Sequence, residues 1–243
     1  MILKIAYFNW SSGKDSAFAL FKILAEKEFK ITKLVTTVNS DVDRVSMHGL
    51  REKLLDIQAE SLGFELKKIP LSANVTMSEY SKILSEAAQQ LVEEGNTHSI
   101  FGDIFLEDLK TYREKQLQKA GLTAVFPLWK RNTSELIKEF IDLGFKAITV
   151  CVNANHLDES FVGRVIDKQF IEDLPAGIDP CGENGEFHTF VYDGPIFKNP
   201  IDFRIGEKVA RSYEPTTSED DNCFSDDQKP WDTKFWFCDL IPV

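Results

Sequence analysis

Apolar and polar residues alternate with two different periods along this chain, and the pattern predicts strands and helices in turn. An apolar run at residues 2–9 is followed by apolar positions at helical spacing over 17–29, and then by a β-branched run at 31–38. The same order recurs, with helices expected at 49–62, 78–94, 106–120 and 133–143, and strands at 64–69, 98–101, 123–126 and 145–152. Strands joined through helices pair in parallel by right-handed crossovers. The pattern therefore predicts an α/β fold.

The arrangement that we expect is a doubly wound parallel sheet of strand order 3-2-1-4-5 over residues 1–150. Ligands of such sheets bind beyond the carboxyl ends of the strands, at the point where the strand order reverses. Gly102 and Asp103 directly follow the fourth predicted strand. We therefore expect them to face the end of the first strand across a cleft.

Residues 151–243 differ in composition and are predicted to form a smaller α+β region. Proline and glycine are dense between residues 175 and 200, which excludes long helices there. One helix is expected at 165–174, and short strands are expected at 186–191, 203–211 and 234–240. The last two of these strands could pair as a hairpin.

Six small or polar residues, SSGKDS, join the first predicted strand to the first predicted helix. Such a loop brings backbone N–H groups and the positive end of a helix dipole to one point, which stabilises a bound phosphate. The spacing is not that of the Walker loop, which requires G-x-x-x-x-G-K-[ST]. The alternative is that a serine only caps the helix. Under the phosphate interpretation, the binding residues are Ser11, Ser12, Gly13, Lys14, Asp15 and Ser16.

A second group of polar residues lies in the segment DPCGENGEFHTFVYDGP, residues 179–195. Glu183, Asn184, Glu186 and His188 lie close together there, among glycines that allow a backbone to approach a ligand closely. At strand spacing, Glu186 and His188 share one face. A carboxylate beside an imidazole can act as an acid–base pair, position ammonia or hold magnesium. The alternative is a glycine-rich turn with solvent-facing polar side chains.

Composition narrows the classes of function. The net charge of −11 over 243 residues argues against a large nucleic-acid footprint. No apolar run approaches the roughly 18 residues that span a bilayer, and the first apolar run is too short for a signal peptide, so we expect a cytoplasmic protein without a membrane partner. Neither a zinc site nor a disulfide framework is predicted, because no C-x-x-C pair occurs among Cys151, Cys181, Cys223 and Cys238.

Six segments occur together and in order: SSGKDS at 11–16, SMHGL at 46–50, QAESLG at 58–63, FGDI at 101–104, PLW at 127–129 and GENGEFHTF at 182–190. Together they resemble the diphthine-ammonia ligase family, PP-loop ATP pyrophosphatases of the adenine nucleotide alpha hydrolase-like (HUP) superfamily. GENGEFHTF makes the resemblance specific, whereas SSGKDS is similar to the SGGxDS loop of the whole superfamily. The segment at 45–49 is similar to the bacterial branch of the family. Because bacteria do not make diphthamide, that branch implies another carboxylate substrate.

The resemblance implies an ATP-dependent ligase that adenylates a carboxylate, releases pyrophosphate and transfers ammonia to form an amide and AMP. ATP and Mg²⁺ are the cofactors implied. A small-molecule or protein carboxylate and ammonia are the partners, with a possible homodimer. The catalytic residues that the resemblance implies are Lys14, Asp15, Glu183, Glu186 and His188, with Asp15 near the metal. The residues implied to border the nucleotide are Val38, Asn39, His48, Gly102 and Asp103. The residues implied to border the substrate are Trp129, Asn184, Glu186 and His188.

One departure concerns Ser12, which stands where the family usually has glycine. If that position requires a positive φ, serine costs on the order of 1 kcal/mol relative to glycine. Trp129 either forms a wall of the cleft or closes the core. Two other functions stay open, a PP-loop protein that acts on RNA and a nucleotide sensor without turnover.

Overall fold

The computed structural model describes residues 2–42, 44–45, 49–72, 75–212 and 234–243. Two of the residues named above, His48 and Cys223, lie outside these ranges. The first sheet contains β1 (Lys4–Asn9), β2 (Phe29–Asn39), β4 (Leu66–Leu71), β5 (His98–Ile100) and β6 (Thr123–Val125). These strands are parallel in the order β4-β2-β1-β5-β6, and the short β3 (Arg44–Val45) pairs antiparallel with the end of β2. The predicted order 3-2-1-4-5 is therefore confirmed.

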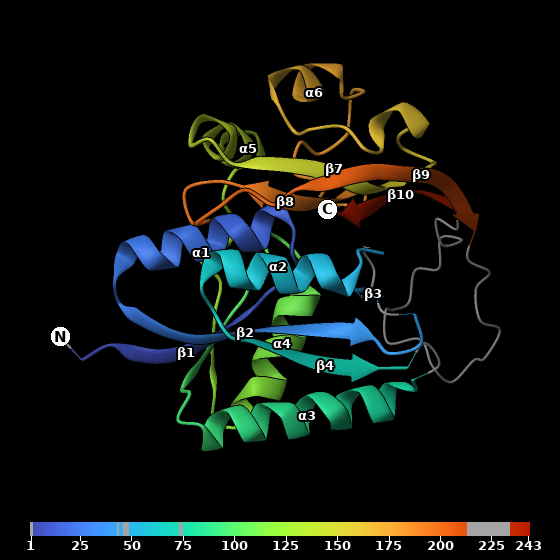
Figure 1. The fold of residues 1–243 in the computed structure, drawn as a ribbon. Coiled ribbons are helices and arrows are strands. Elements are labelled where there is room, and N and C mark those ends of the chain that lie inside the picture. Colours follow the sequence, from blue (N-terminus) through green and yellow to red (C-terminus); the bar gives the residue numbers. More distant parts are fainter. Residues whose placement is uncertain (1, 43, 46–48, 73–74, 213–233) are drawn as a thin grey trace.

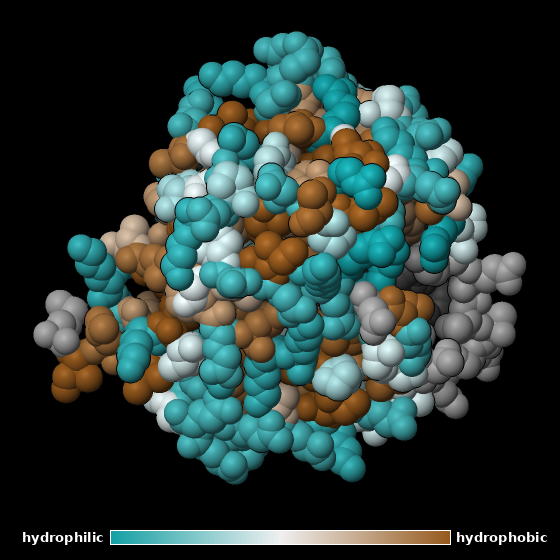
Figure 2. All heavy atoms as spheres, viewed as in Figure 1, coloured by the Kyte–Doolittle hydropathy of each residue, from teal (hydrophilic) through white to brown (hydrophobic). Residues whose placement is uncertain are grey.

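Four helices cover the two faces of the first sheet. Figure 1 shows α1 (Lys14–Glu26) and α2 (Glu52–Leu62) on one face, and α3 (Met77–Glu93) and α4 (Glu107–Lys119) on the other. On α3, Ala87 and Leu91 are buried, and hydrophilic residues cover this lower edge of the molecule in Figure 2. Among the residues described, no helix combines the length and the apolar character that crossing a membrane requires.

The second sheet contains β7 (Lys146–Asn153), β8 (Phe187–Asp193), β9 (Phe203–Ser212) and β10 (Lys234–Pro242). All its pairs are antiparallel, in the order β8-β7-β10-β9, and the predicted hairpin of the last two strands is confirmed. The strand predicted at 145–152 falls within the region 1–150 to which we assigned the parallel sheet, but it belongs to the second sheet. Nearly every residue of β7 is buried, and a continuous apolar run does not reveal which sheet it joins. The division of the chain at residue 150 stays a prediction.

Aromatic side chains join the two sheets. Figure 1 shows the second sheet lying over α1 and α2, with α6 (Lys168–Asp173) on its outer side, whereas α5 (Thr133–Asp142) packs against α1. A short 3-10 helix, η1 (Glu159–Phe161), follows β7. Phe18 of α1 contacts Phe140 of α5 and Phe145 before β7, with ring centroids 6.2 Å apart in both pairs. One continuous apolar core therefore spans both sheets.

A buried polar side chain also joins them. Gln58 of α2 is fully buried, and its Oε1 accepts a hydrogen bond from the indole N–H of Trp10 at 2.9 Å. Its Nε2 donates to the carbonyl oxygens of Ser12 at 3.0 Å and Val191 at 2.6 Å. One amide group thus connects the end of β1, the loop that follows it, and β8.

We expect Gln58→Leu to lower the free energy of unfolding by about 3 kcal/mol, because it removes three buried hydrogen bonds and leaves polar partners unpaired. Urea unfolding followed by circular dichroism measures the change. The matched control is Glu60→Gln at an exposed position of the same helix, with an expected change below about 0.5 kcal/mol. Equal losses in the two variants would show that Gln58 does not connect the sheets energetically.

Candidate functional site

The segment of residues 11–16, called the 11–16 loop here, follows β1 as predicted: residues 11–13 connect β1 to α1, and residues 14–16 belong to the first turn of α1. Within it, the Ser16 hydroxyl donates to the carbonyl oxygen of Gly13 at 3.0 Å. Strand β8 holds it from outside, because Val191 N–H donates to the Ser12 carbonyl and Lys14 N–H donates to Thr189 Oγ1, both at 3.0 Å. The loop is therefore connected to the first sheet through the chain and to the second sheet through hydrogen bonds.

Ser12 has the positive φ at which serine is less favourable than glycine. Its φ is 68°, and the residue is fully buried. Only glycine adopts this conformation without a steric cost, so Ser12 stores strain within the loop.

Gly102 packs directly against the 11–16 loop. A Cβ atom at Gly102 would lie 2.8 Å from the backbone nitrogen of Ser16 and 2.9 Å from the carbonyl carbon of Asp15, so no larger residue fits there. Asp103 points elsewhere and forms an ion pair with Arg113, whose guanidinium lies 4.5 Å from the centre of the Phe101 ring. The structure thus brings Gly102 to the loop and directs Asp103 towards α4.

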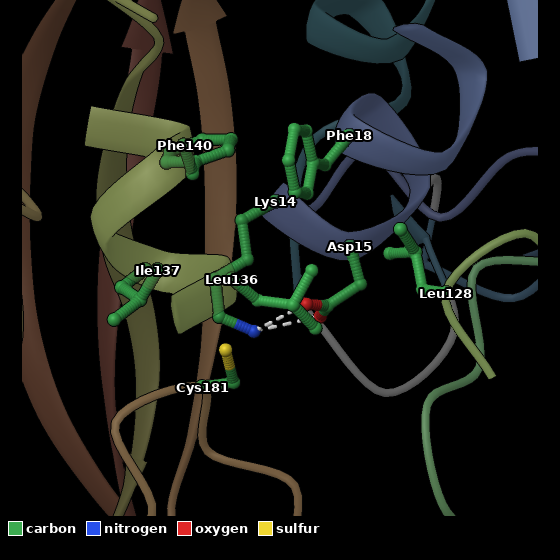
Figure 3. A pocket seen from close by; sticks show the side chains of 8 residues that line it. All are labelled: Lys14, Asp15, Phe18, Leu128, Leu136, Ile137, Phe140 and Cys181. Atoms are coloured by element: carbon green, nitrogen blue, oxygen red, sulfur yellow. Dashed lines mark hydrogen bonds and ion pairs between the residues drawn. The ribbon is translucent and has the colours of Figure 1, made fainter. Parts of the chain in front are cut away.

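Lys14 is a buried cation in the first turn of α1. Its Nζ lies 2.7 Å from both carboxylate oxygens of Asp15 and 5.8 Å from the centre of the Phe187 ring (Figure 3). Burial disfavours the charged amine, but the negative charges of Asp15 and Glu183 outweigh this effect and raise the pKa of Lys14. Lys14 therefore stays charged at neutral pH.

The loop of residues 179–186 is organised by two carboxylates. Asp179 accepts from Cys181 N–H at 2.8 Å and from the Thr133 hydroxyl at 2.7 Å. Glu186 is buried and accepts from Asp179 N–H at 3.0 Å, and from Asn184 N–H at 2.9 Å and Asn184 Nδ2 at 3.0 Å. These contacts close the loop around the Glu186 side chain.

Strand β8 begins after this loop, at Phe187. The strand predicted at 186–191 is therefore confirmed with its start one residue later, and the carbonyl oxygen of Glu186 accepts a hydrogen bond from Asn153 N–H of β7 at 2.8 Å. His188 lies on β8, half-buried, opposite Cys151 of β7.

Glu183 is a carboxylate of this loop that interacts electrostatically with Lys14. Burial is the largest cause that raises its pKa, to about 7, and the nearby negative charge of Asp15 raises it further, against the opposing effect of Lys14. A carboxyl group that titrates near neutral pH can accept or return a proton during a reaction. Cys181 differs: burial raises the pKa of its thiol, so it is not an activated nucleophile.

Three other predicted residues lie outside this group. Val38 is buried in the core at the carboxyl end of β2, and the adjacent Asn39 Oδ1 accepts from Asp41 N–H at 2.9 Å. Trp129 is half-buried and its ring is tilted by 55° against that of Phe126, with Nζ of Lys110 4.6 Å from the Trp129 ring centre.

A small pocket opens beside Lys14, with a cavity volume of about 10 Å³. Figure 3 shows its walls, which come from the first turns of α1, from residue 128, from α5 and from the 179–186 loop. The lining residues are Lys14, Asp15, Phe18, Leu128, Leu136, Ile137, Phe140 and Cys181. The sequence analysis missed the apolar members, because apolar residues at helical spacing on α5 look the same whether they fill a core or line a pocket.

The described side chains near the 11–16 loop include few that could hold a magnesium ion. Within the described ranges, no group of three or more His, Cys, Asp or Glu side chains could hold a metal by itself. Mg²⁺ in nucleotide sites, however, takes one or two carboxylates together with phosphate oxygens. Asp15, 32% exposed beside the 11–16 loop, fits this requirement only when a phosphate is bound as well.

Two family models match the sequence of this chain. The model of the diphthamide synthase N-terminal domain matches residues 4–124, and the model of the diphthamide synthase C-terminal domain matches residues 132–216. The chain belongs to the diphthamide synthase family. The first match covers nearly all of the first sheet, and the second covers β7, β8 and β9 of the second sheet.

The curated relatives of this chain that we compared are diphthine–ammonia ligases. The diphthine–ammonia ligase of Bos taurus is 27% identical over 224 residues, and that of Homo sapiens is 26% identical; each match covers 83% of this chain and 84% of the relative. Among solved structures, the U34-tRNA thiolase NcsA from Methanococcus maripaludis is similar over 58% of this chain and 57% of its own, with a TM-score of 0.35 and 20% identity.

We expect Ser12→Gly to unfold at a free energy about 1 kcal/mol higher than Ser12→Ala, because both lack the hydroxyl and only glycine relieves the strain at φ 68°. Chemical denaturation of the two variants in parallel measures this difference. An alanine variant as stable as the glycine variant would mean that the loop relaxes away from the left-handed conformation.

Glu183 should make stability depend on pH. Its pKa rises from 4.5 in the unfolded chain to about 7 in the folded one, so the folded state holds an extra proton between these values. The unfolding free energy of the wild type minus that of Glu183→Gln should therefore fall as pH rises through this window and stay constant above it. Denaturation at a series of pH values measures the difference, and a flat profile would contradict the assignment.

Proposed function

We propose that this protein is an ATP-dependent ligase that forms an amide from a carboxylate and ammonia, with AMP and pyrophosphate as the other products. The observation that carries the proposal is the contact between the two units of the fold. The 11–16 loop, suited to phosphate, is bound directly by β8, and the titratable Glu183 interacts with Lys14 of that loop. The names of the relatives, diphthine–ammonia ligase, support the same reaction.

In the first step, an oxygen of the substrate carboxylate attacks the α-phosphorus of ATP. A new O–P bond forms, the bond between the α-phosphorus and the bridging oxygen breaks, and pyrophosphate leaves with the electron pair. Lys14 and the N–H groups at the start of α1 stabilise the negative charge that grows on this leaving group.

In the second step, ammonia attacks the carbonyl carbon of the acyl-adenylate. The C–N bond forms, the bond from the carbonyl carbon to the AMP oxygen breaks, and a proton leaves the nitrogen. Glu183 is the proposed acceptor of that proton, because its pKa of about 7 allows it to be ionised at neutral pH and protonated afterwards.

The remaining residues receive supporting roles. Asp15 would hold Mg²⁺ together with the phosphates, where the ion would neutralise phosphate charge. Glu186 is proposed as a positioning residue, because its bonds to Asp179 and Asn184 fix the loop that carries Glu183. The nucleotide is proposed to lie near Val38, Asn39, His48, Gly102 and Asp103, and the acyl group near Trp129, Asn184 and His188.

The carboxylate is proposed to be diphthine or a related carboxylate. The relatives' name favours diphthine itself. The similarity of residues 45–49 to the bacterial branch favours a different acyl group with the same ATP chemistry.

Lys14→Met should lower the rate of AMP and pyrophosphate release by about 100-fold or more, because it removes the cation beside the leaving group. The assay follows ATP labelled in the α- and γ-phosphates, with Mg²⁺, ammonium, and either diphthine or cell extract as the source of carboxylate. Release of ADP by the wild type, or no cleavage with either source, would overturn the proposed function.

The matched control is Lys53→Met, which removes an exposed cation from α2. It should retain wild-type turnover, and circular dichroism should show that both variants are folded. A Lys14→Met variant that is folded and fully active would remove Lys14 from the mechanism.

A further inference from the structure

The pocket beside Lys14 has no assigned ligand. We propose that it is the binding site of the nitrogen nucleophile, a neutral amine of the size of ammonia, and that its apolar walls exclude larger amines. This inference rests on the proposed ligase function and adds the place from which nitrogen enters the reaction.

Size is the first argument. A cavity volume of about 10 Å³ is room for roughly one water-sized molecule. Ammonia has that size, whereas an amine with even one carbon does not fit without movement of the walls. A nucleotide or an acyl substrate is far too large for this space, so a ligand here must be a second, small reactant.

The chemistry of the walls is the second argument. Leu128 is fully buried, and Leu136, Ile137 and Phe140 are each 2% exposed, so one side of the pocket offers only hydrocarbon. An apolar wall disfavours a charged ligand strongly and a small neutral one much less. The pocket therefore favours ammonia over the ammonium ion, and ammonia is the form with a free electron pair for attack.

Position is the third argument. Lys14 and Asp15 line the pocket and also belong to the 11–16 loop, so a molecule in the pocket is adjacent to the phosphates of a nucleotide bound there. Figure 3 shows the polar ends of Lys14 and Asp15 close to Cys181, with apolar side chains around them. Asp15 can accept an N–H of the bound amine, which orients the nitrogen towards the loop.

The test compares two amines. Leu136→Ala removes hydrocarbon from the pocket wall, and the space created should admit methylamine. Amide formation and AMP release are measured with ATP and with ammonium or methylammonium as the only added amine. The carboxylate is supplied as diphthine or as heat-treated extract freed of ammonium. The kcat/KM ratio of methylamine to ammonia should rise at least tenfold in Leu136→Ala.

Leu91→Ala is the matched control, because Leu91 is an equally buried leucine on α3, in the separate apolar cluster beneath the first sheet. It loses the same side-chain volume and should keep the wild-type amine ratio. Leu136→Val, a smaller change, serves as the test variant if Leu136→Ala does not fold, with a smaller shift in the same direction.

The outcomes separate the two proposals. ATP–pyrophosphate exchange by the wild type, measured with a carboxylate and no amine, tests the ligase function alone. If neither this exchange nor AMP release occurs, the ligase function and the amine site are both overturned. If exchange and ammonia-dependent AMP release occur but the amine ratio is the same in wild type, Leu136 variants and Leu91→Ala, the pocket is not the amine site. A rise in both Leu136→Ala and Leu91→Ala would attribute the effect to general loosening and overturn the assignment as well.

Discussion

The hydrogen bonds between the 11–16 loop and β8 are the constraint on which the rest of the site depends. Without the second sheet, the N–H of Lys14 would lose its partner Thr189, and the carbonyl of Ser12 would keep only the bond from Gln58. Strand β8 supplies Thr189 and the N–H of Val191, and the carbonyl of Val191 accepts from Gln58 as well. Because buried hydrogen bonds are costly to leave unmade, these bonds stabilise the placement of the second sheet on α1 and α2. The candidate phosphate site and the Glu183 loop are thereby fixed relative to each other.

The charge of Lys14 and the pKa of Glu183 depend on the burial that this packing produces. Lys14 is buried where an isolated charge would be unfavourable, and Asp15 and Glu183 compensate it. The same burial raises the pKa of Glu183 to about 7 and leaves it titratable near neutral pH. When an anionic phosphate approaches, Lys14 gains an additional partner, and the balance between Lys14, Asp15 and Glu183 changes. Lys14 thus couples phosphate binding at the 11–16 loop to the protonation of Glu183.

The sequence allowed much of the fold to be predicted, because its first half follows a strong local pattern. The parallel order of the first sheet, the 11–16 loop and the β9–β10 hairpin are confirmed. The sheet to which β7 belongs could not be predicted, since its apolar residues fit either sheet. The role of the Glu186 carboxylate, which binds the N–H groups of Asp179 and Asn184, could not be predicted either, because no periodicity encodes these contacts. The pocket was missed for a similar reason, because its walls come from segments that meet only in the folded chain.

The central claim is that ATP binds with its β- and γ-phosphates in the 11–16 loop and its α-phosphate towards Glu183. A crystal structure with α,β-methylene ATP, which cannot be cleaved between the α- and β-phosphates, tests it most directly. We predict density for the terminal phosphates at the N-terminus of α1, with Nζ of Lys14 moved from Asp15 to a phosphate oxygen. A nucleotide bound elsewhere, or bound in the loop with its α-phosphate facing away from Glu183, would contradict the account.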